Sequence, residues 1–321
     1  MTGRGGEAAL TALQPVARAL AVPRTGRWLA LVAGDWLIIV VTIVLCEAFW
    51  SWGGYVLAVL IIGARQHALG ILMHDAVHYG AAPDRRLNDL LGNLLTAYPL
   101  LISLERFRQY HLAHHARTNA EDDPELISLN DPFRRTPFHP LLYWLYLALE
   151  LAGVMFFRVV AMAVYFSFVR PPQPAPRRHV LSERLAGPAL RAVFTLAVLA
   201  VLWATGTLAE AALYWLVPMA TVLNALLRLR ALAEHSGLDS RQAMDGTRNV
   251  MVGPLEAFLI SPHRINLHLA HHLFPAVPSY NMAALHAALH EAVPDYAHQK
   301  ERRDGYILGA GSMRAALCRS N

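Results

Sequence analysis

Residues 28–49 read WLALVAGDWLIIVVTIVLCEAF, a run that is apolar apart from Asp35, Thr42 and Glu47. A helix of about 22 residues is long enough to cross a hydrocarbon layer of about 30 Å. The rest of the chain has a similar character, since 55% of its 321 residues are hydrophobic and only 16% are charged. No long basic run suggests a nucleic-acid partner. The sequence therefore predicts an all-α membrane protein.

Three further apolar runs complete a predicted set of four spans. Residues 55–73 follow the first run after a short aromatic turn, and residues 189–204 and 211–227 flank a second turn. Each pair is expected to form a helical hairpin whose far end becomes polar. Two other apolar runs, 90–102 and 141–168, are expected to be interfacial or re-entrant helices.

The distribution of arginine orients these spans. Neither predicted hairpin turn contains Lys or Arg, whereas thirteen arginines flank the opposite ends: Arg18, Arg24, Arg27, Arg85, Arg86, Arg106, Arg108, Arg134, Arg135, Arg177, Arg178, Arg228 and Arg230. The positive-inside rule places those ends, and both termini, in the cytoplasm. We therefore expect a cytoplasmic N-terminal arm (1–27), an integral-membrane domain (28–290) and a cytoplasmic C-terminal tail (291–321).

Three histidine clusters fall on the predicted cytoplasmic side. His74 and His78 are four residues apart, and the pattern H-x-x-H-H occurs at 111–115 and again at 268–272. A shuffled chain of this composition would contain roughly 0.04 copies of that pattern. Because residues i, i+3 and i+4 share a helix face, each cluster is expected to point into one volume. All-nitrogen ligation suits iron, copper or zinc, and eight imidazoles are too many for one ion. Two metal ions are therefore expected.

Residues beside the clusters extend this candidate site. His235 directly follows the last span, and we expect it to be a ninth ligand or to act with Glu234 in support of the other ligands. Asp75 and the acidic run 121–123 are expected to orient imidazole N–H groups or helix ends. Alternatively, the acidic run 121–123 forms a loop exposed to solvent and has no role at the site.

The remaining histidines are predicted to have other roles. His67, seven residues before the first cluster, is expected to line a cavity or to form a hydrogen bond. His286 and His290 are four apart on a predicted amphipathic tail helix, where a solvated or membrane-surface position is expected. Surface positions are expected for the others: His139, His179, His263 and His298.

Four motifs together resemble a known family: HDAVHYG (74–80), YHLAHHARTN (110–119), AEH (233–235) and NLHLAHHLFP (266–275). Their order and spacing resemble those of the membrane-bound fatty acid desaturase superfamily in its bacterial form, over roughly residues 30–290. The resemblance implies a non-haem diiron site, four transmembrane helices under a cytosolic helical cap, and O2-dependent attack on an acyl C–H bond. The implied metal ligands are His74, His78, His111, His114, His115, His235, His268, His271 and His272.

The resemblance also implies a location and partners. We expect an integral protein of the bacterial inner membrane, with its metal site in the cytoplasm and a lipid or fatty acyl substrate. Electrons are expected from a separate donor, such as a ferredoxin, a rubredoxin or a cytochrome b5-like protein with its reductase. Arg106, Arg108 and Arg117 are candidates to meet an anionic head group or a small acidic carrier. The positive-inside rule explains these three arginines equally well.

Several alternatives stay open. The first box has three residues between its histidines where acyl-CoA desaturases usually have four, which weakens the case for a CoA thioester substrate. Relatives with the same boxes are hydroxylases, ketolases or decarboxylases. A zinc-dependent membrane amidase needs about three protein ligands and an open water position, so it would leave five or six histidines unexplained. A non-enzymatic metal-binding membrane protein is the remaining alternative.

Overall fold

The computed structural model describes most of the chain: residues 4–120, 123–124, 140–154, 156–157, 181–235, 238, 243–297, 303–307 and 312. Among these residues, four helical stretches are long and apolar enough to cross a membrane: Thr25–Ala48, Trp52–Val77, Gly187–Thr205 and Leu208–His235. The prediction of an all-α membrane protein with four spans is confirmed. The only strands described, β1 (Val250–Met251) and β2 (Arg303–Asp304), form a short parallel pair.

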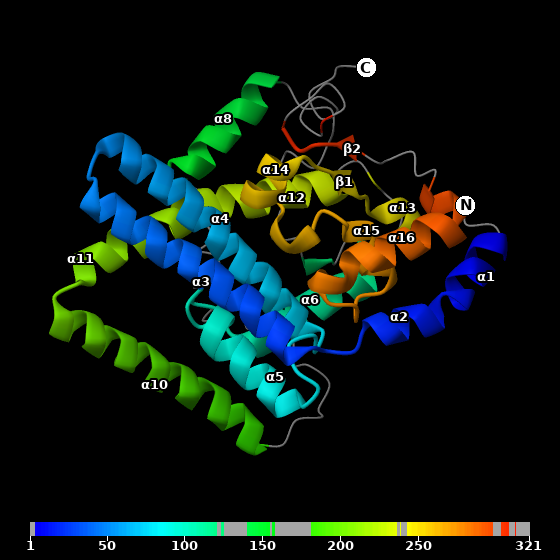
Figure 1. The fold of residues 1–321 in the computed structure, drawn as a ribbon, viewed down its shortest axis with the longest axis horizontal. Coiled ribbons are helices and arrows are strands. Elements are labelled where there is room, and N and C mark those ends of the chain that lie inside the picture. Colours follow the sequence, from blue (N-terminus) through cyan, green and yellow to red (C-terminus); the bar gives the residue numbers. More distant parts are fainter. Residues whose placement is uncertain are drawn as a thin grey trace.

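Helices α3 (Thr25–Ala48) and α4 (Trp52–Val77) lie side by side (Figure 1). The hydroxyl of Ser51 caps α4 by accepting a hydrogen bond from the Gly54 amide, which ends the intervening turn. In their most apolar stretches, 67% of the residues of α4 are buried but only 22% of those of α3. Helix α4 therefore packs among protein elements, and this explains how it continues through polar residues to Val77, beyond the run predicted from hydropathy.

The second pair of spans consists of α10 (Leu181–Thr205) and a stretch that contains α11 (Leu208–Ala211) and α12 (Asn224–His235). Two π-helical segments, η3 (Ala212–Leu216) and η4 (Met219–Leu223), lie between α11 and α12. No residue in the apolar stretch of α10 is buried, so this helix exposes its surface, as expected for lipid contact. The orientation of the spans in the membrane and the cytosolic position of the cap stay predictions.

The two shorter apolar regions form helices beside the spans. Residues 85–97 form α5 (Arg85–Gly92) and the π-helical η1 (Asn93–Ala97). Helix α8 (Pro140–Leu151) belongs to the second region, of which residues 155 and 158–168 lie outside the described part. Its buried Glu150 forms an ion pair of 3.2 Å with Arg228 of α12. The proposed interfacial position of these helices stays a prediction.

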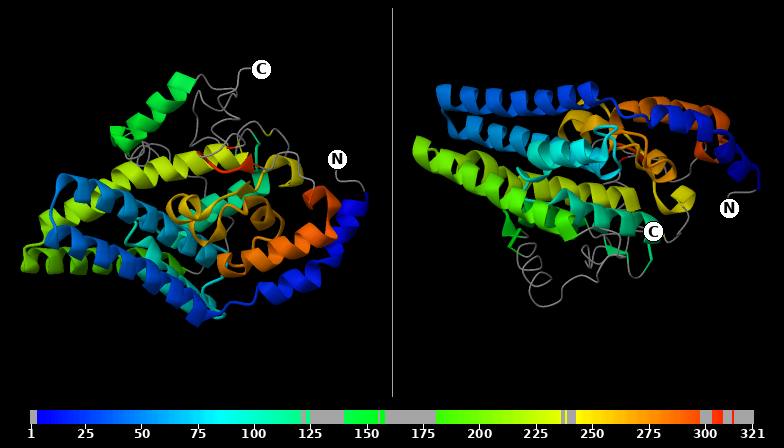
Figure 2. Two further views of the ribbon diagram at one scale, coloured as in Figure 1. Left: turned by 45° about the horizontal axis from the view of Figure 1, so that its top comes forward. Right: turned by 90° about the horizontal axis from the view of Figure 1, so that it is seen from below.

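The remaining elements form a cap at one end of the spans (Figure 2). It contains α6 (Leu104–Arg117), α13 (Ala243–Gly246), α14 (Pro254–Leu259), η5 (Pro262–Arg264), α15 (His268–Leu273), η6 (Ser279–Asn281), α16 (Met282–Ala292) and α17 (Pro294–Ala297). The N-terminal helices α1 (Arg4–Ala12) and α2 (Gln14–Leu20) lie along α16 (Figure 1). Leu13 and Ala17 share a core with Leu285 and Leu289, so apolar packing joins the N-terminal arm to the cap.

Candidate metal centre

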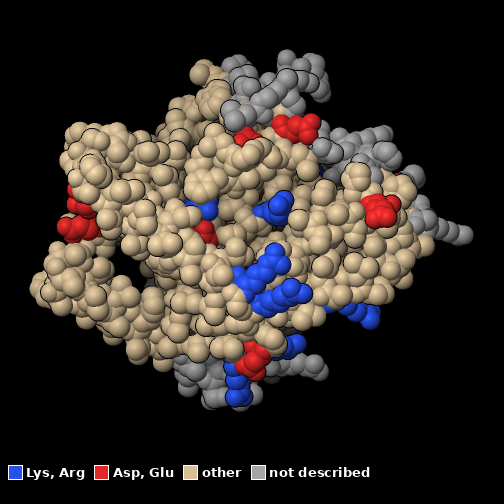
Figure 3. Space-filling view, in the orientation of Figure 1, with Lys and Arg blue, Asp and Glu red and all other residues tan. Residues whose placement is uncertain are grey.

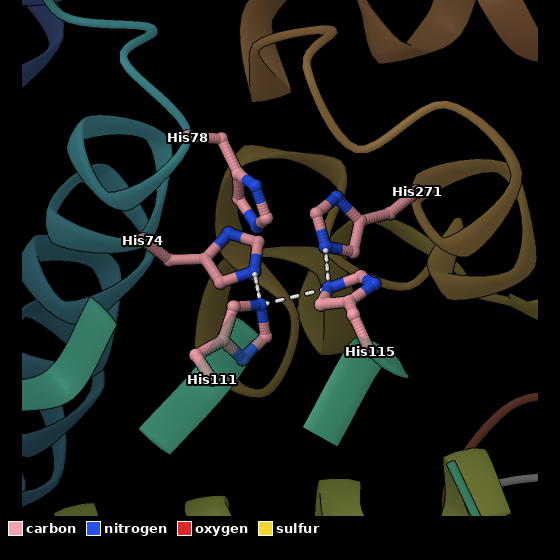
Figure 4. Close-up of side chains that lie close together, drawn as sticks. All are labelled: His74, His78, His111, His115 and His271. Carbon is pink, nitrogen blue, oxygen red and sulfur yellow. Dashed lines mark hydrogen bonds between the residues drawn. The ribbon is translucent and has the colours of Figure 1, made fainter. Parts of the chain in front are cut away.

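The nine predicted histidines lie close together in two groups. Within each group, one ligand nitrogen from every residue lies within 4.8 Å of the others. The first group contains His74, His78, His111, His115 and His271, whose rings point toward one another in Figure 4. The second group contains His114, His235, His268 and His272. The polar ends of α4, α6, α12 and α15 thus meet at one place in the cap.

Each H-x-x-H-H box is divided between the two groups. On α6, His111 and His115 belong to the first group but His114 belongs to the second. Helix α15 shows the opposite division, since only His271 belongs to the first group. Residues i and i+4 are about 40° apart around a helix, whereas i+3 lies about 60° away on the other side. A single box can therefore serve two neighbouring ions, and the expectation of one volume per cluster was wrong in this detail.

The spacing of the ring nitrogens fits a shared metal ion in the first group. Nε2 of His111 lies 2.8 Å from Nε2 of His74 and 2.9 Å from Nε2 of His115 (Figure 4). The Nε2 atom of His115 lies 3.0 Å from that of His271. With metal–nitrogen bonds of about 2.0–2.1 Å, two ligands at a right angle are about 3 Å apart.

The second group shows the same spacing. Nε2 of His268 lies 2.9 Å from Nε2 of His235 and 3.1 Å from Nε2 of His272. In-plane lone pairs on such nitrogens repel one another unless a proton or a cation lies between them. The donor set of both groups therefore fits a metal cofactor.

Burial keeps these imidazoles in the form that binds metal. It lowers the pKa of His78 to about 3, and it holds the pKa values of His268, His271 and His272 well below the ordinary value. Neutral imidazole has a lone pair to donate to a metal ion. In addition, Nε2 of His78 is buried without a hydrogen-bond partner among the described residues. Such an atom is costly to bury, and a metal ion would satisfy it.

Oxygen atoms beside the second group orient its imidazoles. The Nδ1–H group of His114 faces both carboxylate oxygens of Asp123 at 3.0 Å. Nδ1 of His268 lies 3.5 Å from Oε2 of Glu234 but forms no hydrogen bond with it. Nδ1 of His235 lies 3.3 Å from the Gly246 carbonyl oxygen. The contacts of His114 and His235 fix the tautomer that leaves the lone pair on Nε2. The expected orienting role is thus observed for Asp123, while Glu121 and Asp122 lie outside the described residues.

A buried polar network extends from Glu234 into the spans. Arg230 binds both carboxylate oxygens of Glu234 at 2.8 Å, and its Nη1 donates to Nε2 of His67 at 3.1 Å. His67 thus has a hydrogen-bonding role, one of the two roles expected for it. Bidentate pairing compensates the buried carboxylate for its lost hydration.

Arg108 fixes the end of α4 that carries the first box. Its Nε and Nη2 atoms donate to the carbonyl oxygens of Val77 and Ala76, both at 2.9 Å. The same guanidinium binds Asp89 of α5 at 2.6 and 3.0 Å. Arg108 therefore joins α4, α5 and α6 next to the candidate ligands. Its guanidinium is paired within the protein, and the suggestion that it meets a head group or a carrier stays a prediction.

Asp75, between the two histidines of the first box, has a similar effect. Its carboxylate accepts hydrogen bonds from the Ser279 backbone amide at 2.8 Å and the Ser279 hydroxyl at 2.7 Å. Asp75 therefore anchors η6 of the cap to α4, which is the helix-end role rather than the imidazole-orienting one. Sequence reasoning missed Ser279 and the clamp formed by Arg108. For Arg108, its position three residues before His111 was the available signal.

The other histidines lie outside both groups. His286 contacts the Tyr296 hydroxyl at 2.6 Å, and His290 is exposed. The predicted surface position of His263 was wrong, because its Nε2 lies 2.7 Å from the buried carboxylate of Asp35. His139, His179 and His298 lie outside the described residues.

The fold and the two histidine groups define a class: integral membrane proteins with a histidine-rich site that fits a metal cofactor. Residues 50–303 match the family model described as "Fatty acid desaturase". Because this match covers more than half of the chain, the chain belongs to the fatty acid desaturase family. The matched residues include all nine histidines of the two groups.

Three curated relatives illustrate the similarity. The chain is 29% identical to dihydrorhizobitoxine desaturase of Bradyrhizobium elkanii, over 71% of this chain and 65% of the relative. It is 23% identical to a chloroplastic omega-6 fatty acid desaturase of Spinacia oleracea, over 77% of this chain and 54% of the relative. It is also 24% identical to the sn-1 acyl-lipid omega-3 desaturase (ferredoxin) of Nostoc sp. (strain 36), over 78% of this chain and 71% of the relative. The chain thus spans less than two thirds of the length of the first two relatives.

Proposed function

We propose that this protein introduces a C=C bond into a fatty acyl chain, using O2 and two iron ions held by the nine histidines. The observation that carries the proposal is the pair of all-imidazole groups at one end of four apolar spans. Membership of the fatty acid desaturase family supports the same reaction.

Iron suits the centre better than zinc. A catalytic zinc ion has about three protein ligands and an open position for water, whereas the two groups supply five and four imidazoles. When bound, the two iron ions would supply the redox chemistry with O2 that an unactivated methylene requires. The reaction balances when one saturated –CH2–CH2– unit, O2, two electrons and two protons give one –CH=CH– unit and two waters.

The protein's own residues would hold the centre and exclude water from it. His111 and His268 each lie next to two other ligands of their group, so both are central to it. Asp123 and the Gly246 carbonyl oxygen would keep the imidazoles of His114 and His235 in the binding tautomer. Burial of the groups protects the reacting carbon from competing reactions with solvent.

The substrate and the electron donor follow from the same proposal. The exposed apolar surface of α10 fits a protein that meets its lipid or fatty acyl substrate in the bilayer. A separate one-electron donor is required, and the name of the Nostoc relative specifies a ferredoxin. We propose that an acidic ferredoxin-type protein reduces the centre from the cytoplasmic side of a bacterial inner membrane.

A hydroxylase, ketolase or decarboxylase would use the same ligands. The Bradyrhizobium relative is named for dihydrorhizobitoxine rather than a fatty acid, so acyl specificity is the part of the proposal to test first. Lipids of a bacterial host that expresses the chain would be profiled by mass spectrometry beside a His111→Ala control. We expect new acyl species lighter by two hydrogens that are absent from the control.

An oxygen-bearing or chain-shortened product would assign the protein to one of the alternative reactions. An unchanged profile, together with no product from purified iron-loaded protein given a saturated acyl lipid and a reductant, would contradict desaturation. His111→Ala is a sharp control because Nε2 of His111 lies next to two other ligands of the first group.

A further inference from the structure

Three exposed arginines, Arg24, Arg27 and Arg85, surround two tyrosine rings beside the first histidine box. The guanidinium carbon of Arg27 lies 5.1 Å from the centre of the Tyr280 ring. That of Arg85 lies 4.8 Å from the centre of the Tyr79 ring. The backbone amide of Arg24 donates to the Tyr280 hydroxyl at 2.8 Å. These five residues are called the arginine–tyrosine patch below.

The two halves of the patch are joined to each other. The Tyr280 hydroxyl donates to the carbonyl oxygen of Gly80 at 3.2 Å, and Gly80 directly follows Tyr79. Figure 3 shows that Lys and Arg side chains gather near the middle of one face of the molecule, where the start of α3 meets the cap. The printed contacts therefore connect both tyrosines and the three arginines into one group.

The charge of the patch is available for a partner. Arg108 also lies over the Tyr79 ring, at 4.3 Å, but Asp89 neutralises it. Within the part of the chain that the structure describes, no ion pair with a carboxylate is found for Arg24, Arg27 or Arg85. The three exposed guanidinium groups therefore present a net positive surface to negatively charged partners.

The patch adjoins the first histidine group at two points. Tyr79 directly follows His78, a member of that group, and its φ of 62° turns the chain away from α4. Tyr280 directly follows Ser279, which donates two hydrogen bonds to Asp75 inside the first box. Tyr79 of this surface is therefore bonded directly to a candidate metal ligand, which places the patch beside the first group.

We propose that the arginine–tyrosine patch is the docking surface for a negatively charged one-electron donor of the ferredoxin type. This inference rests on the proposed function, since a donor is needed only by a redox centre. Each encounter would oxidise the donor by one electron and reduce the centre by one, so two encounters supply one turnover. Opposite charges raise the rate of encounter, electron-transfer complexes are small and transient, and Tyr and Arg are enriched at protein interfaces.

The test uses the full-length, iron-loaded protein in phosphatidylcholine nanodiscs and a strongly acidic [2Fe–2S] ferredoxin as the probe. Formation of the unsaturated acyl product would be measured for the wild type, for a triple Gln variant (R24Q, R27Q and R85Q) and for the matched triple Lys variant. We expect the Gln variant to lose about tenfold in its second-order rate with ferredoxin at low ionic strength. Its dependence on salt should also flatten, because less attraction is left to screen. The Lys variant should keep most of the rate.

Reduced methyl viologen is the second electron source. It is cationic, so removal of positive charge should not slow its encounter with the protein. We expect all variants to form product at the wild-type rate with this reductant. Arg18→Gln is the single-charge control, because Arg18 is exposed on α2 outside the patch, and it should leave the ferredoxin rate unchanged.

Three results would overturn the docking surface. The Gln variant could keep the full ferredoxin rate and salt dependence, or the wild type could use methyl viologen but not ferredoxin. The third result concerns product formation with methyl viologen. If the Gln variant were slower than the wild type in phosphatidylglycerol nanodiscs but not in phosphatidylcholine nanodiscs, the patch would be assigned to lipid head groups. A wild type that forms no product with either reductant would instead refute the proposed function.

Discussion

The two histidine groups are held in place by different means. Beside the first group, the contacts of Arg108 and Asp75 act on helix ends: they fix the last turn of α4 against α6 and the cap. Beside the second group, Asp123 and the Gly246 carbonyl oxygen contact individual imidazole Nδ1 atoms. The first arrangement sets where the ligand-bearing backbone lies, and the second sets how single rings are turned.

The two arrangements predict different effects on stability and metal binding when one contact is lost. Loss of a backbone clamp should shift several ligands together and should lower stability as well as metal binding. Loss of a carboxylate beside one ring should weaken metal binding and leave the fold nearly intact, because one contact then changes rather than the position of a helix. The variants below test whether the two groups can be perturbed separately.

The largest effect is expected from His268→Ala. Nε2 of His268 faces those of both His235 and His272, so its loss should empty the second group while the first group keeps its ion. Iron analysis should show a fall from two irons to one per chain, with product formation at background. Retention of both irons would show that His268 is not a ligand.

Arg108→Gln is expected to have the next largest effect. It removes the hydrogen bonds to Ala76 and Val77 and leaves Asp89 without its cation. Since hydrogen bonds to charged groups contribute about 1.5–3 kcal/mol each and these groups are partly exposed, we expect a loss of about 2–3 kcal/mol. Thermal unfolding should occur at a lower temperature, and the first group should lose iron before the second.

Arg106→Gln, on the same helix, is the matched control for this variant and should unfold like the wild type. Unchanged unfolding and iron content in Arg108→Gln would contradict the clamp. Preferential loss of iron from the second group would contradict the distinction between the two groups.

A smaller effect is expected from Asp123→Asn. The amide keeps the size of the side chain but accepts a weaker hydrogen bond from Nδ1 of His114. Contacts of this type contribute about 10–100-fold to metal affinity. Competition with a chelator should therefore remove iron from the second group at lower chelator concentration, at an unchanged unfolding temperature. Equal loss from both groups would argue against a local role.

The smallest effect is expected from Ser279→Ala. It removes the hydroxyl that donates to Asp75, but the backbone amide of residue 279 still donates to the same carboxylate. A loss of about 1 kcal/mol is expected, visible as a slightly lower unfolding temperature with both irons retained. Loss of iron from this variant would show that the anchor also controls the ligands.

Sequence reasoning was able to find the four spans and the nine histidines because both are local patterns. Hydropathy marks a span such as 28–49 without any knowledge of its neighbours, and helical spacing brings His111 and His115 onto one side. The assignment of His114 and His271 to different groups from their box partners needed the orientation of α6 relative to α15. That orientation depends on tertiary packing, which spacing alone does not encode.

The supporting residues were harder to find for the same reason. Asp75 was singled out, but its partner Ser279 lies 204 positions away in the chain. In the sequence, Arg108 was one of thirteen arginines predicted to lie on the cytoplasmic side, and its contacts with Asp89 and the end of α4 depend on tertiary packing. His263 was expected at the surface because the buried Asp35 that it contacts is 228 positions away.

Metal analysis of the purified full-length protein tests the central claim most directly. Iron and zinc would be measured per chain for the wild type, with His268→Ala as the internal comparison. The two-group arrangement predicts two irons and no zinc in the wild type and one iron in the variant. One zinc and no iron in the wild type would contradict the proposed diiron centre.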